Sequence, residues 1–124
     1  MLFIKLRYLL FFVLVFLVGL SASFGNDSKL LFFNDEMCSY CRWWEKDIGE
    51  IYPKTEYSDE FKLIRISIEE EFIEPSSGLK KPILGTPTFV FIYHGAELGR
   101  IEGYNGPEMF WWQVESIIDG KIKD

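Results

Sequence analysis

The chain has only two cysteines, and they stand three positions apart in the run Cys38-Ser39-Tyr40-Cys41. An apolar run over residues 29–33 precedes them, and a segment with helical spacing of apolar residues follows from Arg42. A C-x-x-C sequence at a strand-to-helix junction is typical of a redox-active dithiol. The partial positive charge of a helix N-terminus stabilises the thiolate of the first cysteine. The second cysteine, one turn on, is close enough to attack a mixed disulfide and release the partner.

The alternative interpretation of this pair is an inert structural disulfide. A bridge that closes so few residues adds little stability through chain entropy, so we favour the redox interpretation. The pattern therefore predicts Cys38 as the nucleophile and Cys41 as the resolving thiol.

The first 23 residues have the features of an export signal. Lys5 and Arg7 form a short positive region, residues 8–20 are almost wholly apolar, and Ser21-Ala22-Ser23 supplies the small residues of a cleavage site. The apolar run is short for a membrane span, which needs about 20 residues. We expect cleavage near Ser23, with residues 1–23 as the signal peptide and 24–124 as one domain. An uncleaved anchor over residues 2–24 is the alternative, and in both cases the domain lies in a compartment that permits disulfides.

Composition favours a soluble domain with an acidic surface. The chain has 13 basic and 19 acidic residues, and loss of Lys5 and Arg7 with the signal leaves 11 against 19, a formal net charge of −8. Such a charge disfavours nucleic acid as a partner, since nucleic-acid binding requires a basic patch. Aromatic residues make up 18% of the chain, enough for a real core without structural disulfides.

The pattern of apolar residues predicts an α/β domain whose mixed four-stranded sheet is flanked by helices. Pro107 suits the first turn of the last helix, and a short hairpin joins the last two strands. The polar stretch 54–60 is predicted as a connection, and a further short helix is placed either at 69–73 or at 78–83. The expected strands cover residues 29–33, 61–68, 88–93 and 97–102, and the expected helices cover 39–52 and 107–118.

Two separated motifs, Cys38-Ser39-Tyr40-Cys41 and Gly85-Thr86-Pro87-Thr88-Phe89, identify the chain as similar to the thioredoxin superfamily over roughly residues 28–119. The resemblance implies a thioredoxin-like fold and a cis bond before Pro87, on a loop beside the two cysteines. It also implies that this loop keeps metal from the thiols and that the backbone of Thr86 pairs with the substrate peptide.

A narrower resemblance is to the small periplasmic thioredoxins of bacterial sulfur-oxidation operons, the SoxS type. The stretches that carry it are Cys38–Trp44, Asp47–Thr55 and Gly99–Tyr104. This resemblance implies a protein that keeps a periplasmic partner's cysteine reduced or free of thiol adducts.

The residues around the two cysteines are expected to tune the pair. Ser39 and Tyr40 occupy the positions with which thioredoxin relatives set the potential, and Tyr40 is also a candidate substrate contact. Neither is histidine, so one source of thiolate stabilisation is missing, which favours a reductant over a strong oxidant. Arg42 either adds positive potential or is a solvated helix residue. Many thioredoxins bury an acid at the position that Phe32 occupies, so proton transfer falls to water or to Asp35 or Glu36.

Four tryptophans occur in two adjacent pairs, and such residues more often form core and rim than a ligand site. One of each pair should face solvent, where an exposed tryptophan can anchor a partner. His94, the only histidine, falls in the predicted hairpin turn and is expected to be exposed. The pairs are Trp43 with Trp44 and Trp111 with Trp112.

The sequence therefore predicts an exported, periplasmic thiol–disulfide oxidoreductase with no cofactor besides the Cys38–Cys41 disulfide. We expect a monomer that reduces a disulfide or cysteine adduct on a partner protein and is re-reduced by a membrane electron donor. A disulfide oxidase or isomerase and a cytochrome c maturation reductase are alternatives within this class. A Cu(I)-binding module is the alternative from another class, since two thiolates can hold Cu(I). A full zinc site needs more ligands than one chain offers, so no metal site is predicted.

Overall fold

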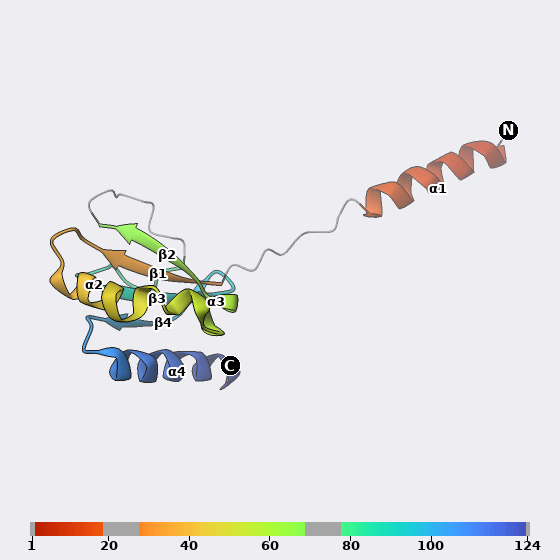
Figure 1. Ribbon diagram of the computed structural model, residues 1–124. Coiled ribbons are helices and arrows are strands. Elements are labelled where there is room, and N and C mark those ends of the chain that lie inside the picture. The colour runs from red at the N-terminus through yellow and green to blue at the C-terminus, as the bar shows by residue number, and fades with distance from the viewer. Residues whose placement is uncertain (1, 19–27, 69–77, 124) are drawn as a thin grey trace.

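The computed structural model describes residues 2–18, 28–68 and 78–123. A helix at the N-terminus is followed by an α/β domain with four strands (Figure 1). The helices are α1 (Leu2–Val18), α2 (Ser39–Trp44), η1 (Glu45–Gly49), η2 (Tyr52–Lys54), α3 (Tyr57–Glu60) and α4 (Pro107–Lys123), and the strands are β1 (Lys29–Asn34), β2 (Lys62–Ser67), β3 (Thr88–Tyr93) and β4 (Ala96–Glu102).

The four strands form one mixed sheet in the order β2-β1-β3-β4. β1 runs parallel to β2 and antiparallel to β3, and β3 pairs with β4 in an antiparallel hairpin. β1 is central, and its four consecutive apolar residues, Leu30 to Phe33, are all buried. A strand covered on both faces is expected to have such a continuous apolar run. The α/β architecture and the mixed four-stranded sheet predicted from the sequence are confirmed.

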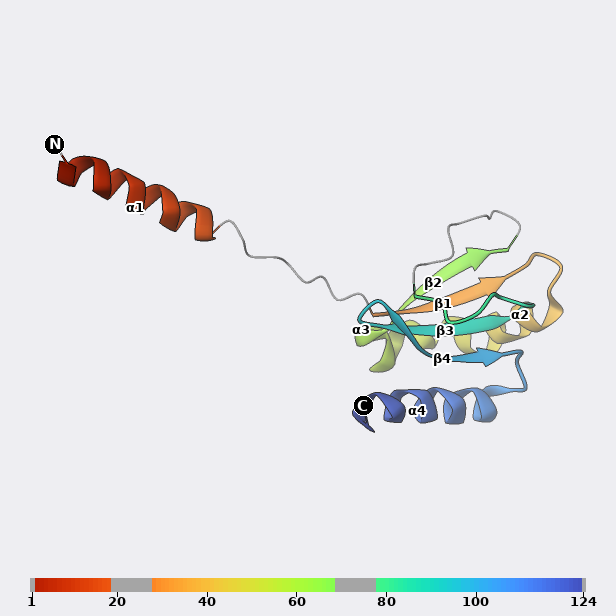
Figure 2. The same cartoon turned by 180° about the vertical axis from the view of Figure 1, so that it is seen from behind.

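The sheet has a core on each face. The larger core lies between the sheet and the helices α2 to α4, with Figures 1 and 2 showing α4 packed along the β4 side. On the opposite face, a smaller cluster is covered by Leu79 and Ile83, from the segment that leads into β3. The larger core includes Leu30, Phe32, Trp44, Ile48, Tyr52, Phe61, Phe89, Phe91, Ile101, Phe110 and Val114, and the smaller one consists of Leu31, Phe33, Val90 and Ile92.

β4 carries a bulge. Phe91 pairs with Gly99 and Ile92 pairs with Glu97, so Leu98 is an extra residue on β4. A bulge inserts one residue and changes which face the following side chains occupy. Glu97 and Arg100 therefore lie on the same face of the sheet, although residues three apart on a regular strand lie on opposite faces.

Several local elements differ from the sequence prediction. The helix expected over 39–52 is regular only to Trp44, widens to a π-helix in η1, and is followed by the 3-10 turn η2, which includes Pro53. Pro is tolerated there because the first turn of a helix needs no N–H donor. The expected connection 54–60 contains the short helix α3, because the Tyr52 hydroxyl donates to the carbonyl of Phe61 (2.7 Å) and draws the chain into a compact turn.

The short helix predicted in the middle of the chain is not present at 78–83, and its other placement, 69–73, lies outside the described residues. The last helix continues to Lys123, beyond the predicted end at 118. No proline follows Ile118 to stop it, and Gly120 is tolerated within it at a modest cost.

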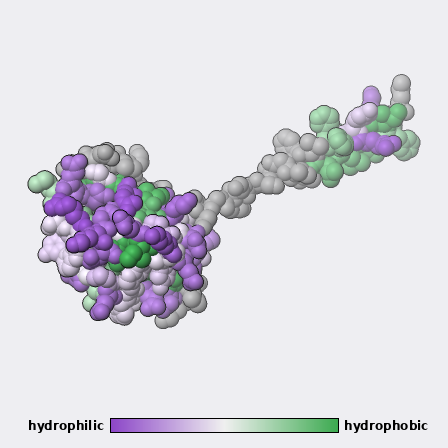
Figure 3. Space-filling view, viewed as in Figure 1, coloured by the Kyte–Doolittle hydropathy of each residue, from purple (hydrophilic) through white to green (hydrophobic). Residues whose placement is uncertain are grey.

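α1 has 17 residues, and the apolar side chains described in it, from Leu2 to Leu14, are exposed. Figure 3 shows a largely hydrophobic surface on this helix and a mainly hydrophilic one on the visible face of the domain. Among the described residues, no helix is both long enough and apolar enough to cross a membrane. The cleavage site expected near Ser23 lies outside the described residues.

Candidate active site

Cys38 and Cys41 form a disulfide at the start of α2, with their Cα atoms 5.2 Å apart. Cys38 is the N-cap of the helix, and its Sγ accepts a hydrogen bond from the backbone N–H of Cys41 (3.0 Å). The backbone N–H of Cys38 donates to the carbonyl of Asp35 (3.0 Å), which fixes the turn between β1 and the helix. The predicted strand-to-helix junction is therefore present, and a backbone N–H of the first helical turn, which has no partner within the helix, donates to the first sulfur.

The two cysteines differ in exposure. Cys41 is buried and belongs to the larger core, whereas Cys38 is half-buried and packs against the edge of that core. A substrate disulfide can therefore approach Cys38 from solvent, while Cys41 is reached from Cys38. This asymmetry suits a mechanism in which one thiol attacks the substrate and the other attacks the resulting mixed disulfide.

The second motif, Gly85–Phe89, lies at the same end of the sheet as the disulfide. Phe33, at the end of β1, is paired with Thr88, at the start of β3. The chain that leaves β1 for Cys38 and the chain that enters β3 from Pro87 are therefore neighbours, although about 50 residues separate them in sequence. The Thr86–Pro87 peptide bond is cis.

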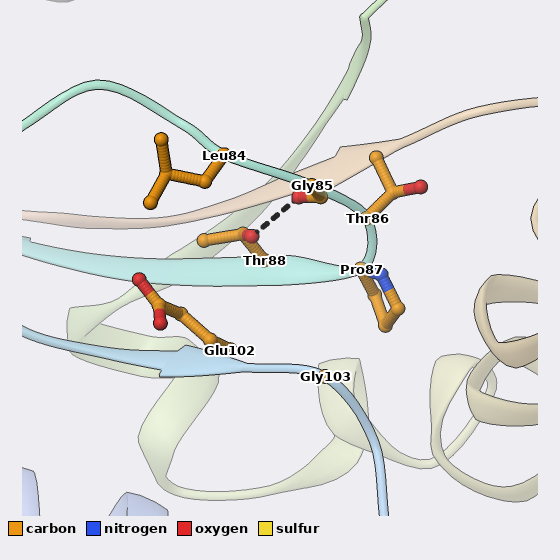
Figure 4. A pocket seen from close by; sticks show the side chains of 7 residues that line it. All are labelled: Leu84, Gly85, Thr86, Pro87, Thr88, Glu102 and Gly103. Carbon is orange, nitrogen blue, oxygen red and sulfur yellow. Dashed lines mark hydrogen bonds between the residues drawn. The ribbon is translucent and has the colours of Figure 1, made fainter.

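Hydrogen bonds hold the loop of the second motif at both ends. The hydroxyl of Thr88 donates to the carbonyl of Gly85 (2.6 Å), and the N–H of Gly103 donates to the carbonyl of Pro87 (2.8 Å). Figure 4 shows this loop beside the end of β4, where together they line a pocket of about 240 Å³. Its lining residues are Leu84, Gly85, Thr86, Pro87, Thr88, Glu102 and Gly103.

Aromatic side chains surround the exposed side of the CxxC motif. Tyr40 is 55% exposed and Trp43 is 44% exposed, and their rings lie 6.1 Å apart. Trp43 also meets Tyr104 edge-on at 5.1 Å. The expected division of each tryptophan pair is present, since Trp44 is fully buried and Trp112 is exposed. The surface next to the disulfide thus offers flat apolar area to a protein partner.

The predicted tuning residues lie in the first turn of α2. Ser39 and Tyr40 are exposed, and Arg42 donates from Nη1 to the carbonyl of Glu36 (2.8 Å). The guanidinium of Arg42 therefore lies back over the turn that precedes Cys38, and the residue is exposed.

At the position where many thioredoxins bury a carboxylate, this chain has Phe32. Phe32 is fully buried there, stacked on Phe89 with ring centroids 4.8 Å apart and in contact with Trp44. Asp35 is used in the turn, where its Oδ1 accepts a hydrogen bond from the N–H of Met37 (3.0 Å). The core side of the site is therefore lined by aromatic rings.

Two polar pairs near the site were not predicted. The Tyr104 hydroxyl donates to Oδ2 of Asp47 (2.8 Å). The pKa of Tyr104 is raised mainly by burial and, to a smaller extent, by its hydrogen bond to this carboxylate. Glu97 and Arg100 form an ion pair on β4 (2.5 Å). For the first pair the sequence offered one indication, since Tyr104 ends the stretch Gly99–Tyr104 that resembles the SoxS type. The second had no signal, because a bulge is needed to bring residues three apart to one face.

His94 is exposed in the hairpin turn with a positive φ of 50°, as its place in the sequence indicated. Within the described ranges, no group of three or more His, Cys, Asp or Glu side chains is arranged to hold a metal ion.

Comparisons with known proteins agree with this geometry. A family model described as a thioredoxin-like domain matches residues 22–118. The periplasmic thioredoxin SoxS from Paracoccus pantotrophus, in its reduced form, is 32% identical, and the match covers 76% of this chain and 98% of that chain with a TM-score of 0.69. A thioredoxin from Malassezia sympodialis, Mala s 13, is 19% identical over 74% of this chain and 78% of that chain, with a TM-score of 0.58, and supports the fold alone. No curated protein sequence matches the chain.

The family match spans the whole of the described domain except the end of α4, and it includes both cysteines and the cis-proline loop. The chain therefore belongs to the thioredoxin-like family, it is similar to the SoxS-type periplasmic thioredoxins, and its Cys38–Cys41 pair makes it a thiol–disulfide oxidoreductase.

Proposed function

We propose that this oxidoreductase is exported and reduces disulfides or cysteine adducts on a periplasmic partner protein. The observation that carries the proposal is the asymmetry of the cysteine pair, with Cys38 accessible at the helix N-terminus and Cys41 buried behind it. Similarity to a periplasmic thioredoxin and the signal-like residues 1–23 support the location, with residues 24–124 as the exported domain.

In the reductive direction, the Cys38 thiolate attacks one sulfur of the substrate disulfide, and the other substrate sulfur leaves as a thiol. The Cys41 thiolate then attacks Sγ of Cys38, which releases the first substrate sulfur and forms the Cys38–Cys41 disulfide. Two electrons pass to the substrate, and a membrane dithiol donor returns two electrons to the pair.

Thr86 and Pro87 are assigned to substrate binding in this proposal. The position of these residues supports the assignment, because their loop lies at the same end of the sheet as the disulfide and borders a pocket. An extended substrate peptide would pair with the backbone of Thr86, a mode of recognition in which main-chain hydrogen bonds supply affinity. Tyr40 adds an exposed aromatic contact, and Ser39, Tyr40 and Arg42 tune the thiolate. We take the protein to act as a monomer.

Insulin reduction with dithiothreitol as electron donor tests this function on the full chain. The wild-type chain should reduce the insulin disulfides catalytically, while Cys38→Ser and Cys41→Ser should both be inactive. Once it has been reduced and freed of dithiothreitol, Cys41→Ser should accumulate a mixed disulfide with insulin, because its Cys38 attacks and no second thiol is left to resolve the adduct.

The matched variant Cys38→Ser distinguishes the roles of the two thiols. It should form no adduct, because Cys41 is buried. An adduct on Cys41 in that variant would reverse the assigned roles, and a wild-type chain that fails to reduce insulin would contradict the proposed reductase.

A further inference from the structure

The segment Gly78–Pro82, which leads into the cis-proline loop, is fastened to the edge strand β4. The backbone N–H of Glu97 donates to the carbonyl of Gly78 (3.0 Å), and the N–H of Lys80 donates to Oε1 of Glu97 (3.2 Å). Glu97 thus contacts this segment through both its backbone and its side chain. No regular secondary structure holds residues 78–82, so these contacts, together with the packing of Leu79 on the smaller core, determine where the segment lies.

Arg100 completes the attachment. Its Nη2 donates to the carbonyl of Lys81 (2.9 Å), and its Nη1 donates to the carbonyl of Pro82 (3.2 Å). The same guanidinium makes two hydrogen bonds to Glu97, from Nε to Oε2 (3.0 Å) and from Nη2 to Oε1 (2.5 Å). One planar group therefore joins the strand carboxylate to two consecutive backbone carbonyls, which a lysine ammonium has no geometry to match.

The pair is nearly shielded from water, with the side chain of Arg100 7% exposed and that of Glu97 5% exposed. Burial disfavours the ionised carboxylate, but the hydrogen bonds from Arg100 and Lys80 outweigh it, so the pKa of Glu97 is lowered. The hydrogen bonds that Arg100 donates to the Glu97 carboxylate raise the pKa of Arg100. A buried ion pair contributes little net stability compared with apolar residues of the same size, so stability alone is a weak reason for this pair.

The same pair also reaches the pocket beside the cis-proline loop. Glu102, which lines that pocket, lies 3.9 Å from Nη1 of Arg100 and 3.2 Å from Nζ of Lys81. Figure 4 shows the two walls of the pocket, the loop Leu84–Thr88 and the end of β4. Arg100 lies close to Glu102 on the second wall and binds the carbonyl of Pro82, two residues before the first.

We propose that Glu97 and Arg100 are positioning residues for substrate binding. They fix the segment Gly78–Pro82 on β4 and thereby set the place of Thr86 and Pro87 relative to the Cys38–Cys41 disulfide. This inference rests on the proposed function, in which the backbone of Thr86 pairs with a substrate peptide. Removal of the pair should weaken the binding of a peptide disulfide and leave the chemistry of the two thiols intact.

Kinetics with two substrates test the inference on the full chain. Insulin presents a peptide disulfide that must pair with the loop, whereas oxidised glutathione is a small disulfide that needs little of this surface. Arg100→Ala should raise the KM for insulin by about tenfold and leave kcat nearly unchanged, because an error in positioning acts on binding. Its rate constant with oxidised glutathione should stay within about twofold of the wild-type value.

Conservative variants and a control complete the design. Arg100→Lys should give an intermediate KM, and Glu97→Gln should be the mildest, since its amide oxygen still accepts from Lys80 and Arg100. Arg65→Ala is the matched control, because it removes another arginine–glutamate pair, with Glu45, that makes no contact with residues 78–88 in the described structure. It should not change the KM for insulin. Thermal unfolding of every variant is measured alongside, so that Arg100→Lys and Glu97→Gln remain informative if Arg100→Ala does not fold.

The outcomes separate the two proposals. An unchanged KM in Arg100→Ala or Arg100→Lys, or equal losses with insulin and oxidised glutathione, would overturn the positioning role while the wild-type activity still supports the reductase. A wild-type chain without insulin reductase activity would overturn the reductase, and the positioning role would fall with it.

Discussion

Phe32 shows how one residue sets the environment of the disulfide. It is fully buried between Phe89 and Trp44, directly behind the strand-to-helix junction that carries Cys38. An ionised group at this position would have no hydrogen-bond partner among these rings and would lose its hydration. We therefore expect the thiols of this chain to exchange protons with solvent or with groups on the exposed side of the site.

Phe32→Asp tests this account of the residue. Since the substitution removes a buried ring and introduces a polar group without a partner, it should lower the free energy of unfolding by at least about 3 kcal/mol. Urea denaturation measures the change. Phe32→Leu is the control, which stays apolar and should cost substantially less. Equal losses for the two variants would show that the site accepts a carboxylate and that the aromatic rings around it are not a barrier to one.

At the scale of elements, the contact between β4 and α4 has little spare room. A Cβ placed on Gly99 would lie 3.0 Å from Cγ1 and 3.1 Å from Cγ2 of Ile117 on α4. Gly99 follows the bulged residue Leu98 and faces the larger core, so the absence of a side chain lets the helix approach the strand. This contact fixes α4 on the β4 side of the sheet.

Gly99→Val is expected to lower the free energy of unfolding by about 1–3 kcal/mol, because added methyl groups force α4 away from the sheet. The comparison variant is Gly120→Ala, also involving α4. A Cβ on Gly120 meets no atom within 4 Å, so this change should be neutral or raise stability by up to about 1 kcal/mol. Denaturant titration of both variants decides the matter. If Gly99→Val left the free energy of unfolding unchanged, that result would contradict the close β4–α4 contact.

The elements also show what sequence alone predicts well. β3 (Thr88–Tyr93) has the predicted bounds, and the CxxC motif begins its helix at Ser39 as expected, because periodicity and chain breakers act locally. The π-helix η1 and the helix α3 could not be predicted, since they depend on tertiary contacts such as the hydrogen bond from Tyr52 to Phe61. The Glu97–Arg100 pair was missed because the bulge at Leu98 has no sequence signature.

At the scale of the whole molecule, the fold brings together two motifs that are about 50 residues apart. Cys38 follows the carboxyl end of the central strand β1. The antiparallel neighbour β3 begins at that same end of the sheet, directly after the cis-proline loop. The exposed aromatic residues Tyr40 and Trp43 lie on the same helix, α2, that Cys38 caps. In the proposed function a protein disulfide binds at this end of the sheet, and the chemistry is that of one dithiol.

The direction of electron flow is the central claim, and the reduction potential of the Cys38–Cys41 pair tests it most directly. The full chain is equilibrated with dithiothreitol or glutathione redox buffers, and the fraction of oxidised pair is measured by thiol alkylation. Since no histidine lies between the cysteines to stabilise the thiolate strongly, we predict a potential well below about −200 mV, on the side of the thioredoxins. A value near about −120 mV, typical of a strong oxidant, would contradict the reductase and favour disulfide formation in client proteins.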